Sequence, residues 1–162
     1  MTVRSYKTED RERLVEMFME MLQAQQSYIS HGEIQMGLSY DGQTLAPDAK
    51  EKWQHYLDRH SSSNKSFIYV LEDAEKIVGF TIFGIEDDYD KEYGVIYDIL
   101  VSDEYRGTGA SSKLFQQAMD TLKINNLTDC YLESGVENHR AHSFFEKKGF
   151  KHVSNIYRLH DI

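Results

Sequence analysis

The sequence contains one cysteine and one proline, and it contains no long apolar run. The single thiol, Cys130, cannot form a disulfide within the chain or build a cysteine-based zinc site, which fits a reducing compartment. No stretch approaches the roughly 18 apolar residues of a membrane span, and the first residues lack the apolar core of a signal peptide. We therefore expect a cytoplasmic protein without a membrane partner.

Basic residues are also scarce, because 18 Lys and Arg stand against 27 Asp and Glu and give a formal charge of -9. Nucleic-acid backbones and anionic membranes attract basic faces, so neither is expected as the main partner. The charge favours cationic partners only weakly, since acidic surface also serves solubility. With no internal repeat and no proline-rich linker, residues 1–162 are expected to form a single domain.

A buried strand, a glycine turn and a helix follow one another between residues 94 and 122. Residues 96–101 are apolar, except for Asp98, and rich in β-branched side chains, which is typical of a strand buried in a sheet. A helix is expected to begin near residue 110, because apolar residues then recur on one helical face, at Leu114, Phe115, Ala118, Met119 and Leu122.

The turn at residues 106–111 places Gly107 and Gly109 between the strand and the helix. Glycine permits a tight turn with uncovered N–H groups, and the helix start adds unpaired N–H groups and partial positive charge. These features suit the binding of a phosphate group, although glycines in such a turn can also be present only because the backbone conformation requires them. The spacing matches neither the GxGxxG motif of dinucleotide sites nor the GxxxxGK[ST] motif of triphosphate sites.

This segment resembles the signature V-x-x-x-Y-R-G-x-G-x-(G/A) of the GNAT superfamily, the acyl-coenzyme A-dependent N-acetyltransferases. The matching residues are Val101, Tyr105, Arg106, Gly107 and Gly109. Ser111 stands where the family has Gly or Ala. Serine is small, so we expect the turn to close around a pyrophosphate.

Residues 137–150 resemble a second family segment, N-x-x-A-x-x-(F/L)-Y-x-x-x-G-F. Asn138 is a suitable N-cap for a helix, and Gly149 is suited to end it before a strand that begins at Phe150. Alone, this pattern would describe any well-capped amphipathic helix. Two matches in the family's order and spacing identify the chain as similar to the GNAT superfamily.

The remaining elements follow from apolar periodicity. Residues 30–46 lack such periodicity and are expected to be a long mobile loop. Pro47 is expected to open a helix that buries Trp53, Tyr56, Leu57 and part of His60. Residues 86–92 read as an acidic hairpin loop, and its acidic residues are expected, together with Asp98 and the segment at residues 30–46, to select a cationic amine. The other expected elements are strands at residues 3–6, 67–71, 77–85 and 130–134 and a helix at residues 9–26.

The resemblance implies an α/β fold, with a GNAT-like mixed central β-sheet flanked by helices. It also implies that the sheet splays between the strand ending at Val101 and the strand at residues 130–134. The cofactor implied is acetyl-CoA (coenzyme A), and no metal is assigned. The residues that the resemblance assigns to cofactor binding are Leu100, Val101, Arg106, Gly107, Thr108, Gly109, Ala110, Ser111, Asn138, Phe144 and Phe145.

The implied reaction is direct attack of an amine on the thioester, which needs a proton acceptor. Asp98 is the first candidate for this base, because a carboxylate in an apolar strand is costly unless it is paired or faces a wet cavity. A structural hydrogen-bonding role is the alternative reading. Glu133 is the second candidate for the base; the alternative is that it is a solvated residue at the end of a strand.

Phe145 replaces the tyrosine that serves the family as the acid for the leaving thiolate. Three accounts remain open: Tyr131 or Tyr157 reaches the sulfur, water protonates it, or the domain binds acyl-coenzyme A without turnover. We expect an enzyme whose partner is a small-molecule amine, one that is cationic. The alternatives are a non-catalytic acyl-coenzyme A sensing module and a protein N-terminal or lysine acetyltransferase. The oligomeric state is left open between monomer and homodimer.

Overall fold

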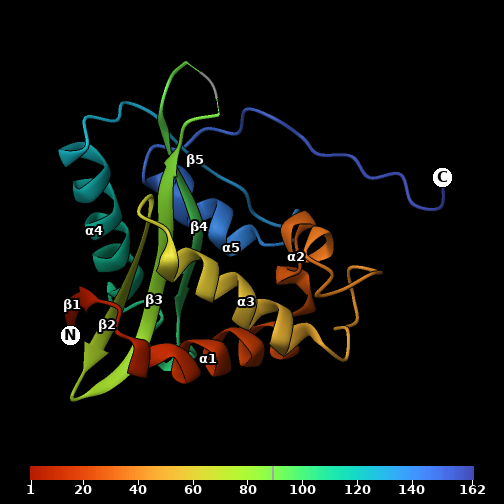
Figure 1. Cartoon of the computed structure of the whole chain (residues 1–162), viewed down its shortest axis with the longest axis horizontal. Coiled ribbons are helices and arrows are strands. Elements are labelled where there is room, and N and C mark those ends of the chain that lie inside the picture. Colours follow the sequence, from red (N-terminus) through yellow and green to blue (C-terminus); the bar gives the residue numbers. More distant parts are fainter. Residues whose placement is uncertain (89) are drawn as a thin grey trace.

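Five strands form one mixed sheet in the computed structural model, which describes residues 1–88 and 90–162 (Figure 1). The strand order is β1-β2-β3-β4-β5. Strands β1 to β4 pair with one another antiparallel, and β5 pairs with β4 parallel. The strands are β1 (Thr2–Ser5), β2 (Ser66–Asp73), β3 (Lys76–Glu86), β4 (Tyr93–Val101) and β5 (Cys130–Leu132). The helices are α1 (Arg11–Ala24), α2 (His31–Gln35), α3 (Ala49–Ser62), α4 (Ala110–Ile124) and α5 (His139–Lys147).

Helices cover both faces of this sheet, as the sequence pattern predicts. On one face α1 and α3 bury a cluster in which Phe18 stacks on Trp53 with 4.3 Å between ring centroids, above Phe80 and Ile82 of β3. On the other face α4 and α5 pack against β3 and β4, through a cluster that contains Phe83, Ile96, Phe115, Leu122 and Phe145. No helix among the described residues has the length and apolar character needed to cross a bilayer.

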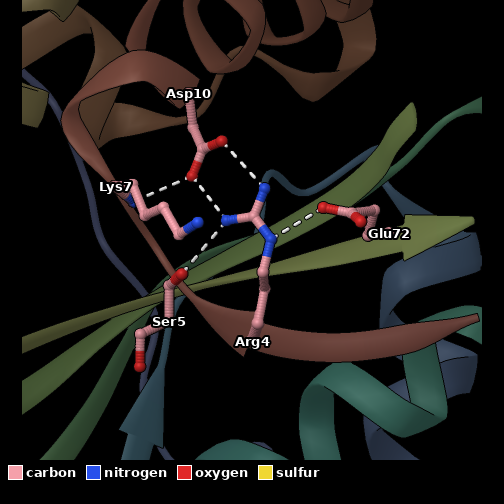
Figure 2. A network of polar contacts seen from close by, with 5 residues as sticks. All are labelled: Arg4, Ser5, Lys7, Asp10 and Glu72. Carbon is pink, nitrogen blue, oxygen red and sulfur yellow. Dashed lines mark hydrogen bonds and ion pairs between the residues drawn. The ribbon is translucent and has the colours of Figure 1, made fainter. Parts of the chain in front are cut away.

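A polar network fastens β1 to β2 and to the start of α1 (Figure 2). The Arg4 guanidinium donates to both carboxylate oxygens of Asp10, at 2.8 and 2.9 Å, and to Glu72 Oε2 at 2.7 Å. Asp10 is buried and also accepts from the Lys7 backbone N–H at 2.8 Å. The hydrogen bonds from Arg4 lower the pKa of Asp10, so this buried carboxylate stays ionised. The network is far from the cavity described below and is structural.

The prediction of a loop at residues 30–46 is wrong for residues 31–35, which form α2, whereas residues 36–46 contain no further helix or strand; the mobility of the segment stays a prediction. Ser30 caps α2: its Oγ accepts from Gly32 N at 3.3 Å, while Glu33 accepts from the Ser30 backbone N–H at 2.7 Å. Leu38 then enters the core and is fully buried. Single apolar anchors and side-chain caps order this segment, and neither produces the periodicity that sequence reasoning relies on.

The strand predicted from Phe150 onward is also wrong for the described residues. α5 begins and ends as predicted. At its start, Asn138 Oδ1 accepts from Ala141 N at 3.2 Å, and after its end Gly149 adopts a φ of 94°. Phe150 packs against the core cluster beneath α5. Beyond it, residues 151–162 have no regular secondary structure and run away from the sheet (Figure 1).

Candidate active site

The sheet splays between β4 and β5, as the resemblance implies. β5 pairs only with the first part of β4, from Gly94 opposite Cys130 to Ile96 opposite Leu132, and β4 continues to Val101. A cavity of about 780 Å³ lies at this opening. Its walls come from the second half of β4, the turn before α4, the segment after β5, α5, and the first two helices with the residues that join them.

A bulge in β4 turns Asp98 toward this cavity. Ile82 of β3 pairs with Asp98 and Phe83 pairs with Ile96, so Tyr97 is an extra residue in the β4 strand. In a regular strand Ile96 and Asp98 would share a face. Here Ile96 packs in the cluster with α4, whereas Asp98 bonds to a side chain of α3, on the opposite face.

Asp98 is a carboxyl group with one direct partner and a cavity before it. The Tyr56 hydroxyl donates to Asp98 Oδ2 at 2.7 Å, and Thr81 Oγ1 donates to the Asp98 backbone oxygen at 2.9 Å. The His60 ring lies between those of Tyr56 and Tyr97, with 4.5 Å between ring centroids in each pair. This packing helps to hold Tyr56 in place. Tyr56 itself does not line the cavity.

Burial raises the pKa of Asp98 to about 7, and the Tyr56 hydrogen bond opposes that shift. The negative charges of Glu33 and Glu133 raise the pKa further. A carboxyl group with a pKa near neutrality can both accept and release a proton under ordinary conditions. This property is typical of a general base.

Glu33 and Glu133 line the same cavity as Asp98, from α2 and from the segment after β5. His31 Nε2 lies 2.6 Å from Glu133 Oε2, and burial raises the pKa of Glu133 against the opposing effect of His31. Ser30 Oγ donates to Glu33 at 2.6 Å. Three carboxyl groups from three separate segments thus meet at this part of the cavity.

The glycine turn and the start of α4 bring backbone donors to the same cavity. Gly107 and Gly109 adopt φ of 76° and 87°, which disfavours any side chain, although a Cβ at either position would meet no atom within 4 Å. Gly109 is the N-cap of α4, so the first N–H groups of that 15-residue helix have no intrahelical acceptor. An open turn, exposed N–H groups and a helix N-terminus fit a pyrophosphate.

Three basic side chains line the cavity as well: Arg106 before α4, and Arg140 and Lys147 on α5. Arg106 forms an ion pair with Asp103, and its side chain is 23% exposed. Ser134 Oγ, after β5, is buried without a hydrogen-bond partner in the described part of the chain and belongs to the same wall. These groups can hold the phosphates and the polar arm of a coenzyme A molecule.

Most of the residues singled out from the sequence lie at this one cavity. Three do not, namely Thr108, Tyr131 and Tyr157. Thr108 is exposed and its Oγ1 donates to Tyr105 O at 2.6 Å, and Tyr131 is 49% exposed with its ring edge-on to Tyr93. Tyr157 is 89% exposed on the C-terminal segment. The residues that line the cavity are Asp98, Glu133, Leu100, Val101, Arg106, Gly107, Gly109, Ala110, Ser111, Asn138, Phe144 and Phe145.

Phe145 is buried against the rings of Phe144 and Phe150, at 5.2 and 5.7 Å, and no hydroxyl is present at its position. The acidic residues of the β3–β4 hairpin loop, which we expected to select the substrate, are absent from the cavity wall. Sequence reasoning missed Glu33, Arg140 and Tyr56. Arg140 lies inside a recognised motif, but Glu33 and Tyr56 carry no local signal, because tertiary packing alone brings them to Asp98.

The fold and the cavity together suit a protein that binds a phosphate-bearing cofactor at the glycine turn and a cationic group near the carboxyl groups. The sequence pattern of the Acetyltransferase (GNAT) family matches residues 23–150. The chain belongs to this family and is an acetyltransferase that uses acetyl-CoA.

Relatives and solved structures agree with that assignment. The chain is 29% identical over 122 residues to N-alpha-acetyltransferase 30 of Schizosaccharomyces pombe, covering 73% of this chain and 80% of that protein. It is 29% identical over 101 residues to spermidine N(1)-acetyltransferase of Vibrio cholerae, covering 62% of this chain and 58% of that protein.

Among solved structures, an aminoglycoside antibiotic 6'-N-acetyltransferase from Acinetobacter haemolyticus superposes with a TM-score of 0.75 at 12% identity, covering 100% of this chain and 99% of that one. An acetyltransferase from Clostridium acetobutylicum solved with acetyl-CoA gives 0.72 at 16% identity, with 98% and 95% covered. At these identities the likeness concerns the fold.

Proposed function

We propose that the acceptor is a small cationic alkyl amine and that Asp98 takes the proton from it. The observation that carries the proposal is the position of Asp98, turned by the β4 bulge into a cavity that Glu33 and Glu133 also line. Three carboxyl groups favour a ligand with positive charge and disfavour an anionic one. The raised pKa of Asp98, about 7, suits proton transfer near neutral pH.

An alkyl amine needs such a base more than other amines do. With a pKa near 10 it is only about 0.1% neutral at pH 7, a deficit of roughly 4 kcal/mol. A carboxylate that binds the ammonium form and accepts its proton removes much of this deficit. The peptide α-amino group has a pKa near 8, so about a tenth of it is already neutral and it gains less.

The chain's own residues hold the cofactor, which supplies the acetyl group as a thioester when bound. The backbone N–H groups of Gly107 and of residues 109–112 would hold the pyrophosphate, and Arg106, Arg140 and Lys147 would add positive charge there. The half of β4 that β5 leaves unpaired, residues 97–101, exposes backbone groups to the cavity. The proton from the amine goes to an oxygen of Asp98.

A second candidate acceptor is the N-terminal α-amine of a protein, because two relatives are named N-alpha-acetyltransferases. The two candidates differ in what they ask of the carboxyl groups. A polyamine needs all three for its several charges, whereas a peptide N-terminus carries one charge and needs room for a chain.

Thiol release from acetyl-CoA, measured with spermidine, an aminoglycoside, a lysine derivative and a short peptide with a free N-terminus, tests the proposal. We expect kcat/KM to be highest for a polycationic alkyl amine, and its KM to rise several-fold between about 50 and 300 mM salt as charges are screened. Glu33→Gln and Glu133→Gln should each raise that KM. Glu92→Gln, on the hairpin outside the cavity, is the matched control. A salt-independent KM, or preference for the peptide, contradicts a polycationic substrate.

A further inference from the structure

Tyr97 and Asp98 are consecutive residues of β4, and both of their side chains face α3. In a regular strand, successive side chains point to opposite faces of the sheet. Here the Tyr97 ring packs on the ring of His60, with 4.5 Å between centroids, and Asp98 Oδ2 accepts from the Tyr56 hydroxyl at 2.7 Å. The bulge at Tyr97 thus places two neighbouring side chains of one strand against the same helix.

α3 supplies one partner to each of these side chains, at a spacing of one helical turn. Tyr56 and His60 are four residues apart, so they lie on the same side of the helix. Their rings meet edge-on, with 4.5 Å between centroids and 76° between planes. From Asp98 the contacts lead to Tyr56, then to His60, then to Tyr97, which is the residue before Asp98 in the chain. These four residues form a closed ring of contacts.

The sheet fixes both Tyr97 and His60. The Tyr97 hydroxyl donates to Glu86 at the end of β3. Gly84 of β3 leaves room for the Tyr97 ring, because a Cβ on Gly84 would lie 2.9 Å from Tyr97 Cε2. Ser66 Oγ of β2 lies 2.8 Å from His60 Nδ1. The ring of contacts is therefore anchored on β2 and β3 as well as on α3.

We propose that His60 is a positioning residue for Asp98, because its ring packs between Tyr56 and Tyr97 and keeps the Tyr56 hydroxyl on the Asp98 carboxyl group. The inference rests on the proposed function, in which Asp98 is the base. His60 is not among the residues that line the cavity, so it acts through its neighbours and not on the substrate. Burial lowers the pKa of His60 to about 4, so the imidazole is uncharged near neutral pH and acts by packing.

The first test is the titration of Asp98, followed by ¹³C NMR of the aspartate carboxyl carbons, with Asp98→Asn to assign the signal. The hydrogen bond from Tyr56 lowers the pKa of Asp98, whereas burial and the charges of Glu33 and Glu133 raise it. His60→Asn keeps a polar side chain but lacks the ring, so Tyr56 should lose its place and the midpoint of Asp98 should rise by roughly one pH unit. Tyr56→Phe should raise it by a similar amount, and the double variant should add little more.

His60→Phe and Ser66→Ala are the matched controls. The first keeps an aromatic ring without Nδ1, and the second removes the hydroxyl beside Nδ1 while it keeps the ring. Both should leave the Asp98 midpoint unchanged. An unmoved or lowered midpoint in His60→Asn, or an equal rise in Ser66→Ala, would overturn the proposal. Circular dichroism verifies folding, and His60→Gln takes the place of His60→Asn in the same titration if the latter does not fold.

Kinetics connect this packing to the reaction. At pH 6 a midpoint that is higher by one unit leaves about a tenfold smaller ionised fraction, so His60→Asn should lower kcat/KM for the amine about tenfold there and far less at pH 9. Its affinity for acetyl-CoA should stay within about twofold of the wild type, since His60 lies outside the cavity. In the Asp98→Asn background the same change should have little effect, and an equal loss in both backgrounds would contradict positioning through Asp98.

The two measurements separate this proposal from the proposed function. The NMR titration follows the carboxyl group and needs no turnover. If Asp98→Asn retains wild-type kinetics while His60→Asn shifts the titration, Asp98 is not the base but His60 still positions it. If Asp98→Asn loses activity and His60→Asn leaves the titration unmoved, Asp98 remains the base and the role of His60 is refuted.

Discussion

Asp98→Asn removes a carboxylate from the cavity while it keeps the local structure. Asparagine is nearly the same size, and its side-chain oxygen can still accept the Tyr56 hydroxyl that now lies 2.7 Å from Asp98. The backbone bond from Thr81 is untouched. A change in kinetics would therefore report the lost proton acceptor and not a displaced strand.

The expected loss depends on pH in a way that the structure fixes. Asp98, with a pKa of about 7, must be ionised to take the proton, so kcat/KM of the wild type should rise up to pH 7 and then level off. The variant depends on free amine alone, and its kcat/KM should rise tenfold per pH unit toward the amine pKa near 10. General-base catalysis contributes about 10²- to 10⁴-fold. We expect the wild-type rate to exceed the variant's by about 10²- to 10³-fold at pH 6 and by no more than about tenfold at pH 9.

The assay is initial-rate thiol release at subsaturating amine between pH 6 and 9, with circular dichroism to verify folding. If Asp98 only attracted the cation electrostatically while free amine attacked, the ratio of wild type to variant would grow with pH through the pKa of Asp98. An equal loss at every pH would indicate a structural role. A profile identical to the wild type would place the base elsewhere, and Glu133 would be tested next.

Three further predictions concern the neighbours of that reaction. Gly109→Val should weaken acetyl-CoA binding, measured by calorimetry, far more than Thr108→Ala. The φ of 87° at Gly109 disfavours a β-branched residue, whereas Thr108 is exposed and outside the cavity. Equal losses of affinity would argue against the turn as the phosphate site. Tyr56→Phe removes the hydrogen bond that lowers the pKa of Asp98, so the inflection of kcat/KM should move to higher pH, and an unmoved inflection would deny Tyr56 a positioning role. Phe145→Tyr should leave acetyl-CoA affinity within about twofold, and it should raise kcat or leave it unchanged, because the added hydroxyl supplies a proton donor. A tenfold fall in kcat would show that the cavity needs an apolar side chain at this position.

The cofactor end of the site was predictable because its chemistry is local in the sequence. A glycine with positive φ is required where a strand turns sharply into a helix, and Gly107 and Gly109 mark this turn within three residues. The apolar spacing of α4 and the capping residues of α5 are equally local. Sequence reasoning therefore recovered the strand, turn and helix, and the structure brings all three to one cavity.

The acceptor end could not be read in the same way. Glu33 reaches the cavity on α2, a five-residue helix whose sequence carries no apolar periodicity. Tyr56 is one of two large aromatic residues on α3, with Trp53, and only the packing of α3 on the sheet brings its hydroxyl to Asp98. The C-terminal strand was wrong for a related reason, since pairing depends on which edge is available and not on the segment alone.

The bulge at Tyr97 joins these two ends of the site. Without the extra residue, Asp98 would lie on the same face of β4 as Ile96, beneath α4, where a carboxylate would not reach Tyr56. With it, one strand serves both purposes. Its last residue, Val101, leads into the turn proposed to hold phosphate, and three positions earlier the carboxyl group of Asp98 faces the cavity that Glu33 and Glu133 also line. In the proposed reaction the distance between cofactor and base is set by β4 itself, a buried strand, whereas the carboxyl groups that complete the proposed acceptor end come from α2 and the segment after β5. Transfer and acceptor choice would then rest on different elements, and we expect changes in α2 to alter the acceptor while the geometry of transfer is kept.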